Sequence, residues 1–189
     1  MNFVLRAVFA LIAIAILSSC ANGPTYDKAT IYYDRPTFVD SVTHDDPSIA
    51  EKVIQHGRCT LNIASTPDAK MAPQDFCIFA LTRDALHVLK WNANDTRYER
   101  LTTVNFKNVE QVALASQFRH RQVQMIEKKR VVAFSVIIDD GGIFDADATS
   151  KVFDVVAAAG IPVATSKGMI VPPRRGGAIC SDLHREVIR

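Results

Sequence analysis

Between residues 58 and 138 the hydrophobic positions of this chain follow a two-residue period. Cys59, Leu61 and Ile63 alternate with Thr60 and Asn62, and later segments repeat the pattern or form short apolar runs. Such alternation is typical of strands that bury one face. Short loops separate seven segments of this kind, at residues 59–63, 75–81, 86–91, 98–104, 109–115, 122–126 and 131–138. Their regular spacing predicts an antiparallel meander that closes into a barrel or a sandwich.

A short helix is predicted before the strands. Asp46 suits a helix N-cap, Pro47 suits the first helical position, and Gly57 stands where the helix would end. A metal site built on His44, Asp45 and Asp46 is the alternative, but consecutive side chains point in different directions, so we favour the cap. Three apolar residues would share one face of this helix: Ile49, Val53 and Ile54.

A longer helix of about twelve residues is predicted after the strands. Asp145 or Asp147 would cap its start, Gly160 would end it, and Pro162 would prevent its continuation. Its apolar stripe consists of Val152, Phe153, Val155, Val156 and Ala159.

Seven antiparallel strands followed by one amphipathic helix resemble the pleckstrin-homology-like (PH-like) barrel. Residues 80–89 (ALTRDALHVL) are similar to the turn between the second and third strands of bacterial members, and residues 104–112 (VNFKNVEQV) to the stretch that follows. The resemblance covers residues 57–160. It implies a mainly β (α+β) fold, a seven-stranded antiparallel barrel or sandwich with a C-terminal helix, here with a short N-terminal helix added. The superfamily hosts binding and scaffold functions, and the fold alone does not decide between them.

The N-terminus carries a targeting pattern. Of residues 1–19, 15 are hydrophobic, and residues 7–17 are uninterrupted apolar positions preceded by Arg6. This order of charge, short apolar run and small residues is typical of a signal peptide, and the run is short for a membrane-spanning helix.

Leu17-Ser18-Ser19-Cys20 resembles the lipobox of bacterial lipoproteins. The resemblance implies that the Cys20 thiol receives a diacylglycerol and that Cys20, also acylated (for example with palmitate), becomes the first residue after cleavage. Ala21 stands where an Asp commonly retains such lipoproteins in the inner membrane. The expected location is therefore the periplasmic face of the bacterial outer membrane.

Four segments are expected along the chain. Residues 1–19 form the signal peptide, 20–45 a tether, 46–166 the PH-like β domain with its C-terminal helix, and 167–189 a flexible basic tail. Within the tether, residues 31–33 and also Phe38 and Val39 could dock as an edge strand.

Three cysteines remain once Cys20 is lipidated. Cys59 and Cys77 are equidistant from Asp68, so a simple hairpin turning there would place them side by side. In the oxidising periplasm we expect a disulfide between them, worth about 3 kcal/mol for a loop of this length, with two buried free thiols as the alternative. Cys180 would be left unpaired in the tail.

Basic residues flank the predicted strand 122–126. They are candidates for contact with lipid headgroups or another anionic envelope polymer, or they keep exposed turns soluble. Because they lie at opposite ends of the strand, they need not form one patch. The candidates are Arg119, Arg121, Lys128, Lys129 and Arg130.

The sequence offers little catalytic chemistry. Ser181, Asp182 and His184 are the residue types of a hydrolytic triad, but they crowd into a tail that cannot orient them. Asp139 and Asp140, with the acidic residues that follow, do not match a calcium-binding loop and suit a turn and a helix start. We therefore expect no catalytic residues, no metal and no cofactor.

Lys and Arg number 22 against 20 Asp and Glu, so no chain-wide basic field favours nucleic acid. The resulting expectation is a lipid-anchored, non-catalytic binding or scaffold module with a protein partner in the cell envelope, and an accessory role in an envelope assembly fits this expectation. The alternatives are a carrier of lipid or another small ligand, and a periplasmic hydrolase.

Overall fold

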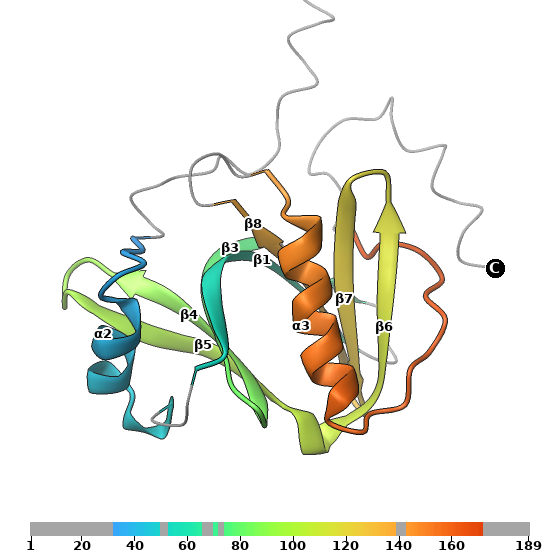
Figure 1. The fold of residues 1–189 in the computed structure, drawn as a ribbon, viewed down its shortest axis with the longest axis horizontal. Coiled ribbons are helices and arrows are strands. Elements are labelled where there is room, and N and C mark those ends of the chain that lie inside the picture. Colours follow the sequence, from blue (N-terminus) through green and yellow to red (C-terminus); the bar gives the residue numbers. More distant parts are fainter. Residues whose placement is uncertain (1–31, 50–52, 66–69, 72–73, 139–142, 172–189) are drawn as a thin grey trace, which may run out of the picture. The chain divides into compact units, whose positions relative to one another are not determined.

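The computed structural model describes residues 32–49, 53–65, 70–71, 74–138 and 143–171. In these ranges the chain forms a curled antiparallel sheet, one helix that packs across it and one smaller helix at its side (Figure 1). The strands lie in the order β5-β4-β3-β1-β8-β7-β6, with the short β2 paired to β1. Their bounds are β1 Gln55–Ser65, β2 Lys70–Met71, β3 Asp75–Leu81, β4 Ala85–Asn92, β5 Arg97–Asn105, β6 Val109–Gln117, β7 His120–Glu127 and β8 Arg130–Ile137.

All seven predicted strands are confirmed, and β2 is a short addition within a predicted loop. The first and last main strands, β1 and β8, pair with one another, which joins the two halves of the meander. The inward positions of all seven strands supply one core, in which the Phe79 and Phe134 rings meet edge to face at 5.0 Å. The expected mainly β fold with a C-terminal helix is therefore correct.

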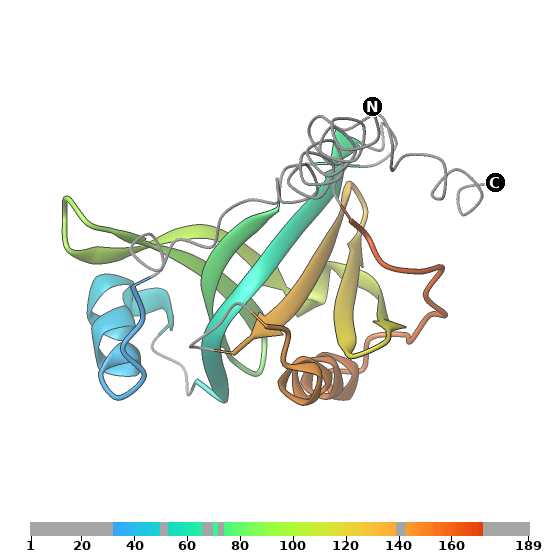
Figure 2. The same cartoon turned by 90° about the horizontal axis from the view of Figure 1, so that it is seen from above.

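The C-terminal helix α3 spans Ala146–Ala158 and begins as predicted. The Asp145 side chain accepts a hydrogen bond from the Ala148 amide at 2.9 Å, which satisfies one of the free N–H groups at the helix start. The buried Thr149 hydroxyl accepts a hydrogen bond from the Val136 amide at 3.0 Å and so ties the helix to β8. Figure 2 shows α3 end-on against the sheet.

The N-terminal helix lies elsewhere than predicted. Helix α2 spans Phe38–Asp45, within the segment predicted as a tether, and the expected edge strand at Phe38 and Val39 is wrong. Phe38 and Val42 are one helical turn apart, and both are fully buried. They pack with the outward side chains Ile78, Ala80 and Leu89 of β3 and β4 and with Tyr98 of β5. The tertiary contact, rather than helix propensity, accounts for this element.

The predicted helix over residues 47–56 is also wrong. Pro47–Ile49 form a single 3-10 turn, η2, and Gln55 already begins β1. The local capping prediction holds in part, because the Asp46 carboxylate accepts hydrogen bonds from the amide and hydroxyl of Ser48. Ile49 is fully buried beside α2, so the apolar residue that suggested a helix is instead part of the packing of the turn.

After α3 the chain turns at Gly160, whose φ of 84° favours glycine, and continues as an extended strap, residues 161–171. Figure 1 shows the strap running beside β6. The strap includes residues 167–171, the first part of the segment predicted as a flexible tail, which are held by hydrogen bonds from β7. The remainder of that tail and residues 1–31 lie outside the described residues.

Candidate functional site

The predicted lipidation residue Cys20 and the signal peptide lie outside the described residues, as do Cys180, Ser181, Asp182 and His184. Among the residues that the structure describes, no helix has the length and apolar character needed to cross a membrane.

The candidate basic residues do not gather into one patch. The two-residue turn between β6 and β7 carries Arg119, whereas Lys128 and Lys129 form the turn at the other end of β7. Arg121 donates a hydrogen bond to the Ser150 hydroxyl at 2.6 Å and lies 3.6 Å from an Asp147 oxygen. Its charge therefore contributes to the contact between β7 and α3.

Arg130 is also engaged in contacts within the protein. Its guanidinium contacts the Glu127 carboxylate and donates hydrogen bonds to the Thr102 hydroxyl at 2.9 Å and the Thr103 carbonyl at 3.1 Å. These contacts join the start of β8 to β5. Of the five candidates, Arg121 and Arg130 are therefore engaged in holding elements together.

Cys59 and Cys77 lie directly opposite one another in β1 and β3, as predicted from the position of the turn. Both are buried free thiols in this structure, with no bond between the sulfurs. Burial, followed by the hydrogen bond and charge interaction with Cys77, raises the pKa of the Cys59 thiol well above its usual value. The disulfide itself stays a prediction. The register of β1 and β3 meets one requirement for it, because it places the two cysteines opposite one another.

The described carboxylates near α2 have neighbours in the protein. The Asp45 side chain accepts a hydrogen bond from the Tyr98 amide at 2.8 Å, and Asp46 pairs with Arg100. Partial burial raises the pKa of Asp46, but hydrogen bonds from Arg100 and Ser48 outweigh this effect, so the pKa lies below its usual value. Within the described ranges no three His, Cys, Asp or Glu side chains form a group that could hold a metal ion.

Two glutamines of β7 were not identified from the sequence, although they organise one surface of the domain. Gln122 and Gln124 are only 2% and 6% exposed, on the face of β7 opposite the core. The Gln122 amide donates to the Ile170 carbonyl at 2.9 Å and accepts from the Ile170 amide at 2.8 Å. The Gln124 amide donates to the Gly168 carbonyl at 2.7 Å. Two side chains thus hold an extended main chain much as a neighbouring strand would.

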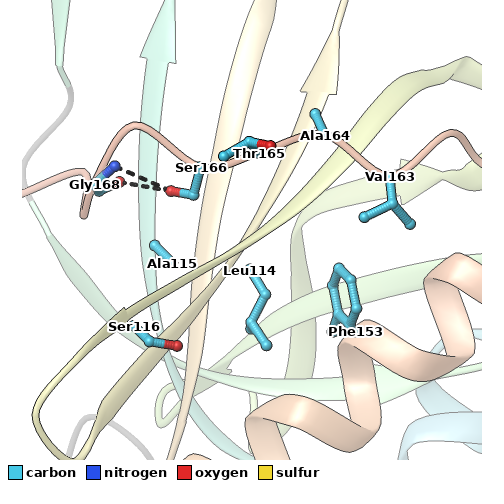
Figure 3. A pocket seen from close by; sticks show the side chains of 9 residues that line it. All are labelled: Leu114, Ala115, Ser116, Phe153, Val163, Ala164, Thr165, Ser166 and Gly168. Carbon is cyan, nitrogen blue, oxygen red and sulfur yellow. Dashed lines mark hydrogen bonds between the residues drawn. The ribbon is translucent and has the colours of Figure 1, made fainter.

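A groove lies between β6, α3 and the strap. We call it the β6 groove; its volume is about 330 Å³. Figure 3 shows Val163 of the strap and Phe153 of α3 pointing toward one another beside Leu114 of β6. The described lining residues are Leu114, Ala115, Ser116, Phe153, Val163, Ala164, Thr165, Ser166 and Gly168.

The strap occupies only part of the β6 edge. Val163 forms an isolated parallel bridge with Val112, through hydrogen bonds of the Val112 amide to Pro162 and of the Ala164 amide to Val112. β6 is the last strand in the sheet order, and Ser116 near its end is exposed. An edge strand beside an apolar groove can accept an additional extended segment.

A second cavity, which we call the β8 pocket, lies on the other flank of α3. It has a volume of about 570 Å³ and is bordered by the start of β1, the end of β8 and the first turns of the helix. Its described lining residues are Arg35, Ile54, Gln55, His56, Gly57, Val136, Ile137, Ile138, Asp145, Ala148, Lys151 and Val155.

Comparison with known proteins yields structural likenesses alone, because no family model and no curated protein matches the chain. The chain is similar to the hSac2 domain of human phosphoinositide phosphatase Sac2, with 5% identity and a TM-score of 0.39 over 77% of this chain and 98% of that domain. It is also similar to the Slm1 PH domain, with 13% identity and a TM-score of 0.37 over 57% of this chain and 96% of that one. A structure containing the PH and C1 domains of the Vav1 exchange factor has 14% identity and a TM-score of 0.36, over 64% and 34% of the two chains. The mainly β fold with a C-terminal helix rests on this chain's own strand order.

Proposed function

We propose that this protein is a lipid-anchored binding module on the periplasmic face of the bacterial outer membrane, with no catalytic role of its own. The lipobox-like sequence ending at Cys20 supports the anchor, and Ala21 supports the outer-membrane location. Two or three acyl chains suffice for stable attachment, because each buried methylene contributes about 0.8 kcal/mol. The module would serve an envelope assembly as an accessory or scaffold protein.

The partner would be an extended polypeptide segment that adds to the β6 edge beside α3. The observation that carries this proposal is the β6 groove, where the edge of the last strand adjoins the apolar side chains of Leu114 and Phe153. Main-chain hydrogen bonds to β6 would supply affinity, and the groove would select side chains at alternate positions.

Anchoring would make this binding local. Tyr33 is 8% exposed and packed beside Phe38, so the free tether is shorter than expected and can include at most residues 20–31. A fully extended chain spans about 3.5 Å per residue, which limits its reach to about 40 Å. A short tether raises the effective concentration of the module for partners near the membrane.

The anchor is tested by Cys20→Ala. We expect the variant to leave the membrane fraction and to lose the mass of the attached lipid, whereas Cys180→Ala keeps both. A Cys20→Ala protein that still fractionates with membranes at the wild-type mass refutes the lipoprotein assignment.

The binding surface is tested with a photo-crosslinking amino acid at Ser116, which is exposed in the β6 groove, and in parallel at Lys107 as an exposed control outside it. In cells, one discrete crosslinked partner from position 116 and none from position 107 supports the proposal. The same crosslinks from both positions, or none from 116, contradicts it.

The alternative, a carrier of lipid or another small ligand, would need a cavity between the sheet and α3, and a barrel filled by side chains counts against it. The interior is filled by one cluster of buried side chains from all seven main strands and α3. A hydrolase would need a nucleophile and a base on rigid elements, and the candidates Ser181, Asp182 and His184 lie outside the described residues.

A further inference from the structure

The hairpin of β6 and β7 carries a fully exposed aromatic side chain at its tip. Phe118 and Arg119 form its two-residue turn, between the paired residues Gln117 and His120. Phe118 is fully exposed, whereas the other exposed large hydrophobic residues of the described ranges reach at most 66%. Figure 1 shows this hairpin extending past the start of α3. The tip therefore presents a phenyl ring to whatever lies beyond the domain.

The backbone conformation of Phe118 is unfavourable for its residue type. Its φ of 54° lies in the left-handed region, which glycine adopts readily and a bulky residue does not. In two-residue hairpin turns, glycine is the usual residue where the first central position has a positive φ. Packing does not account for a phenylalanine there, since its ring is fully exposed. Residues held in such conformations cluster at functional sites, so this one points to a contact outside the domain.

A second exposed apolar residue lies at the same end of the strands. Ile143, between β8 and α3, is 66% exposed. The next residue, Phe144, bridges to Ile137 and stacks on the His120 ring, with the ring centres 3.4 Å apart. Because His120 is two residues from Phe118, this stacked pair holds Ile143 and Phe118 at one end of β7 and β8. We call these two exposed side chains the apolar tip.

Charges at this end of the domain do not select a charged occupant. Arg119 is exposed in the turn, but Asp139 and Asp140 follow the end of β8 in the sequence. Arg121 lies 3.6 Å from an Asp147 oxygen. Because cations and carboxylates are mixed, the apolar tip itself has to favour the occupant. A lipid bilayer meets this condition, since burial of apolar side chains among acyl chains needs no headgroup charge.

The point where the tether joins the domain brings this end toward the membrane. The Tyr33 hydroxyl and the His56 ring, near the start of β1, are hydrogen-bonded at 2.9 Å. Arg58 of β1 pairs with Ile137 at the end of β8, and β7 is the next strand of the sheet. The tether therefore joins the domain at the end of these strands that carries the apolar tip. Its reach of about 40 Å keeps that end near the bilayer that would hold Cys20.

We propose that Phe118 and Ile143 insert into the surface of the bilayer that anchors the protein, as a second membrane contact that does not depend on headgroup charge. This inference rests on the proposed lipid anchor, which supplies proximity, and not on a partner in the β6 groove. Attachment at a single point leaves the domain free to rotate, whereas a second contact holds it in one orientation. Removal of the phenyl ring from water offsets the strained conformation of Phe118.

The test places a benzophenone photo-crosslinking amino acid at position 118 of the full chain in its own membrane. We expect an adduct with the mass of a diacyl lipid, in at least about fivefold greater yield than from Leu101, an exposed control position on β5. An adduct with a protein in place of lipid, or no adduct, would overturn the proposal. Membrane fractionation and the lipidated mass are measured on the same samples. Loss of both refutes the anchor itself, whereas a retained anchor without lipid adducts refutes the apolar tip alone.

Vesicles test the independence from charge. The lipidated protein is reconstituted in phosphatidylcholine with or without phosphatidylglycerol, and the photo-crosslinker at position 118 is activated in both. The yields of lipid adduct should agree within about twofold. An increase of about fivefold or more with the anionic lipid would contradict apolar insertion.

Phe118→Gly separates membrane contact from a structural role. Glycine suits the φ of 54°, so the urea midpoint of the variant should equal or exceed that of the wild type. With the photo-crosslinker moved to position 143, the yield of lipid adduct should fall at least about threefold in Phe118→Gly and stay unchanged in the control Leu101→Ala. A lower urea midpoint would assign Phe118 a structural role instead, and an unchanged adduct yield would refute the membrane contact.

Discussion

The substitution Phe38→Ala tests whether α2 is an integral part of the folded domain. Phe38 is fully buried. The centre of its ring lies 5.3 Å from that of Tyr33, 5.1 Å from that of His56 and 5.0 Å from that of Tyr98. Truncation removes these contacts and leaves a cavity, because neighbouring side chains relax only in part. Buried Phe→Ala changes cost about 3–5 kcal/mol. With a urea dependence of about 2 kcal/mol per molar, the unfolding midpoint should fall by about 2 M.

Two optical probes report on different parts of the domain. Trp91, the single tryptophan of the chain, packs beside the cluster that contains Phe38, so its fluorescence follows the α2 side. Far-ultraviolet circular dichroism follows the whole sheet. If α2 and the sheet unfold as one cooperative unit, both midpoints should fall together in the variant.

Asp40→Ala is the matched control, because Asp40 is an exposed residue in the first turn of the same helix and should contribute less than about 1 kcal/mol. A loss below about 1 kcal/mol in Phe38→Ala would refute the packing argument. A shift of the Trp91 transition alone would show that α2 unfolds separately from the sheet.

Three further predictions concern single side chains. Asp145→Ala should lower the free energy of unfolding by about 1 kcal/mol, measured by thermal denaturation, because the Ala148 amide loses its cap; an unchanged midpoint would contradict the assigned cap. In the reduced folded protein, Cys59 and Cys77 should resist iodoacetamide at pH 8 and react only after unfolding, because both are buried and the pKa of Cys59 is raised; rapid labelling of the native state would count against this structure. Burial, with a smaller contribution from a nearby arginine charge, lowers the pKa of His87, so the unfolded chain binds this proton at higher pH than the folded protein. Stability should therefore fall as the pH drops below about 6.5, and His87→Gln should reduce that fall between urea midpoints at pH 7.5 and pH 5; an identical fall in the variant would exclude His87 as its source.

The sequence allowed the strands and the C-terminal helix to be predicted because their evidence is local. A two-residue period identifies each strand, and Asp145 ahead of an apolar stripe identifies the start of α3. The opposition of Cys59 and Cys77 also followed from local evidence, since a hairpin fixes which residues face one another around its turn.

The helix α2 could not be found in this way. Two of its residues, Phe38 and Val42, are fully buried, with Val39 partly buried beside them, and Thr37 at its start makes no side-chain capping hydrogen bond. What holds the helix is distant in sequence: the Tyr98 amide donates to Asp45, 53 residues away, and Arg100 pairs with Asp46. Contacts between residues distant in sequence also outweigh local capping at Gln55. This residue begins β1, although the capping residues before it had favoured a helix.

The basic residues show that contacts between residues distant in sequence were also not predictable at the candidate site. Sequence placed Arg121 and Arg130 in a basic group, but a charge run does not disclose its partners. The fold brings Asp147 and Ser150 to Arg121, and Glu127 and the β5 backbone to Arg130, so both contribute to packing.

The sequence by itself determined the period of each strand, the C-terminal helix and the expectation of a lipid anchor at Cys20, because each depends on neighbouring residues. Tertiary structure decided what covers the outer faces of the sheet. Gln122 and Gln124 read as ordinary outward strand positions, yet they are buried because the chain after α3 returns across β7 and offers its main chain to their amides. The two cavities beside α3 arise in the same way, since each is bounded by segments far apart in the chain whose proximity only the folded sheet creates.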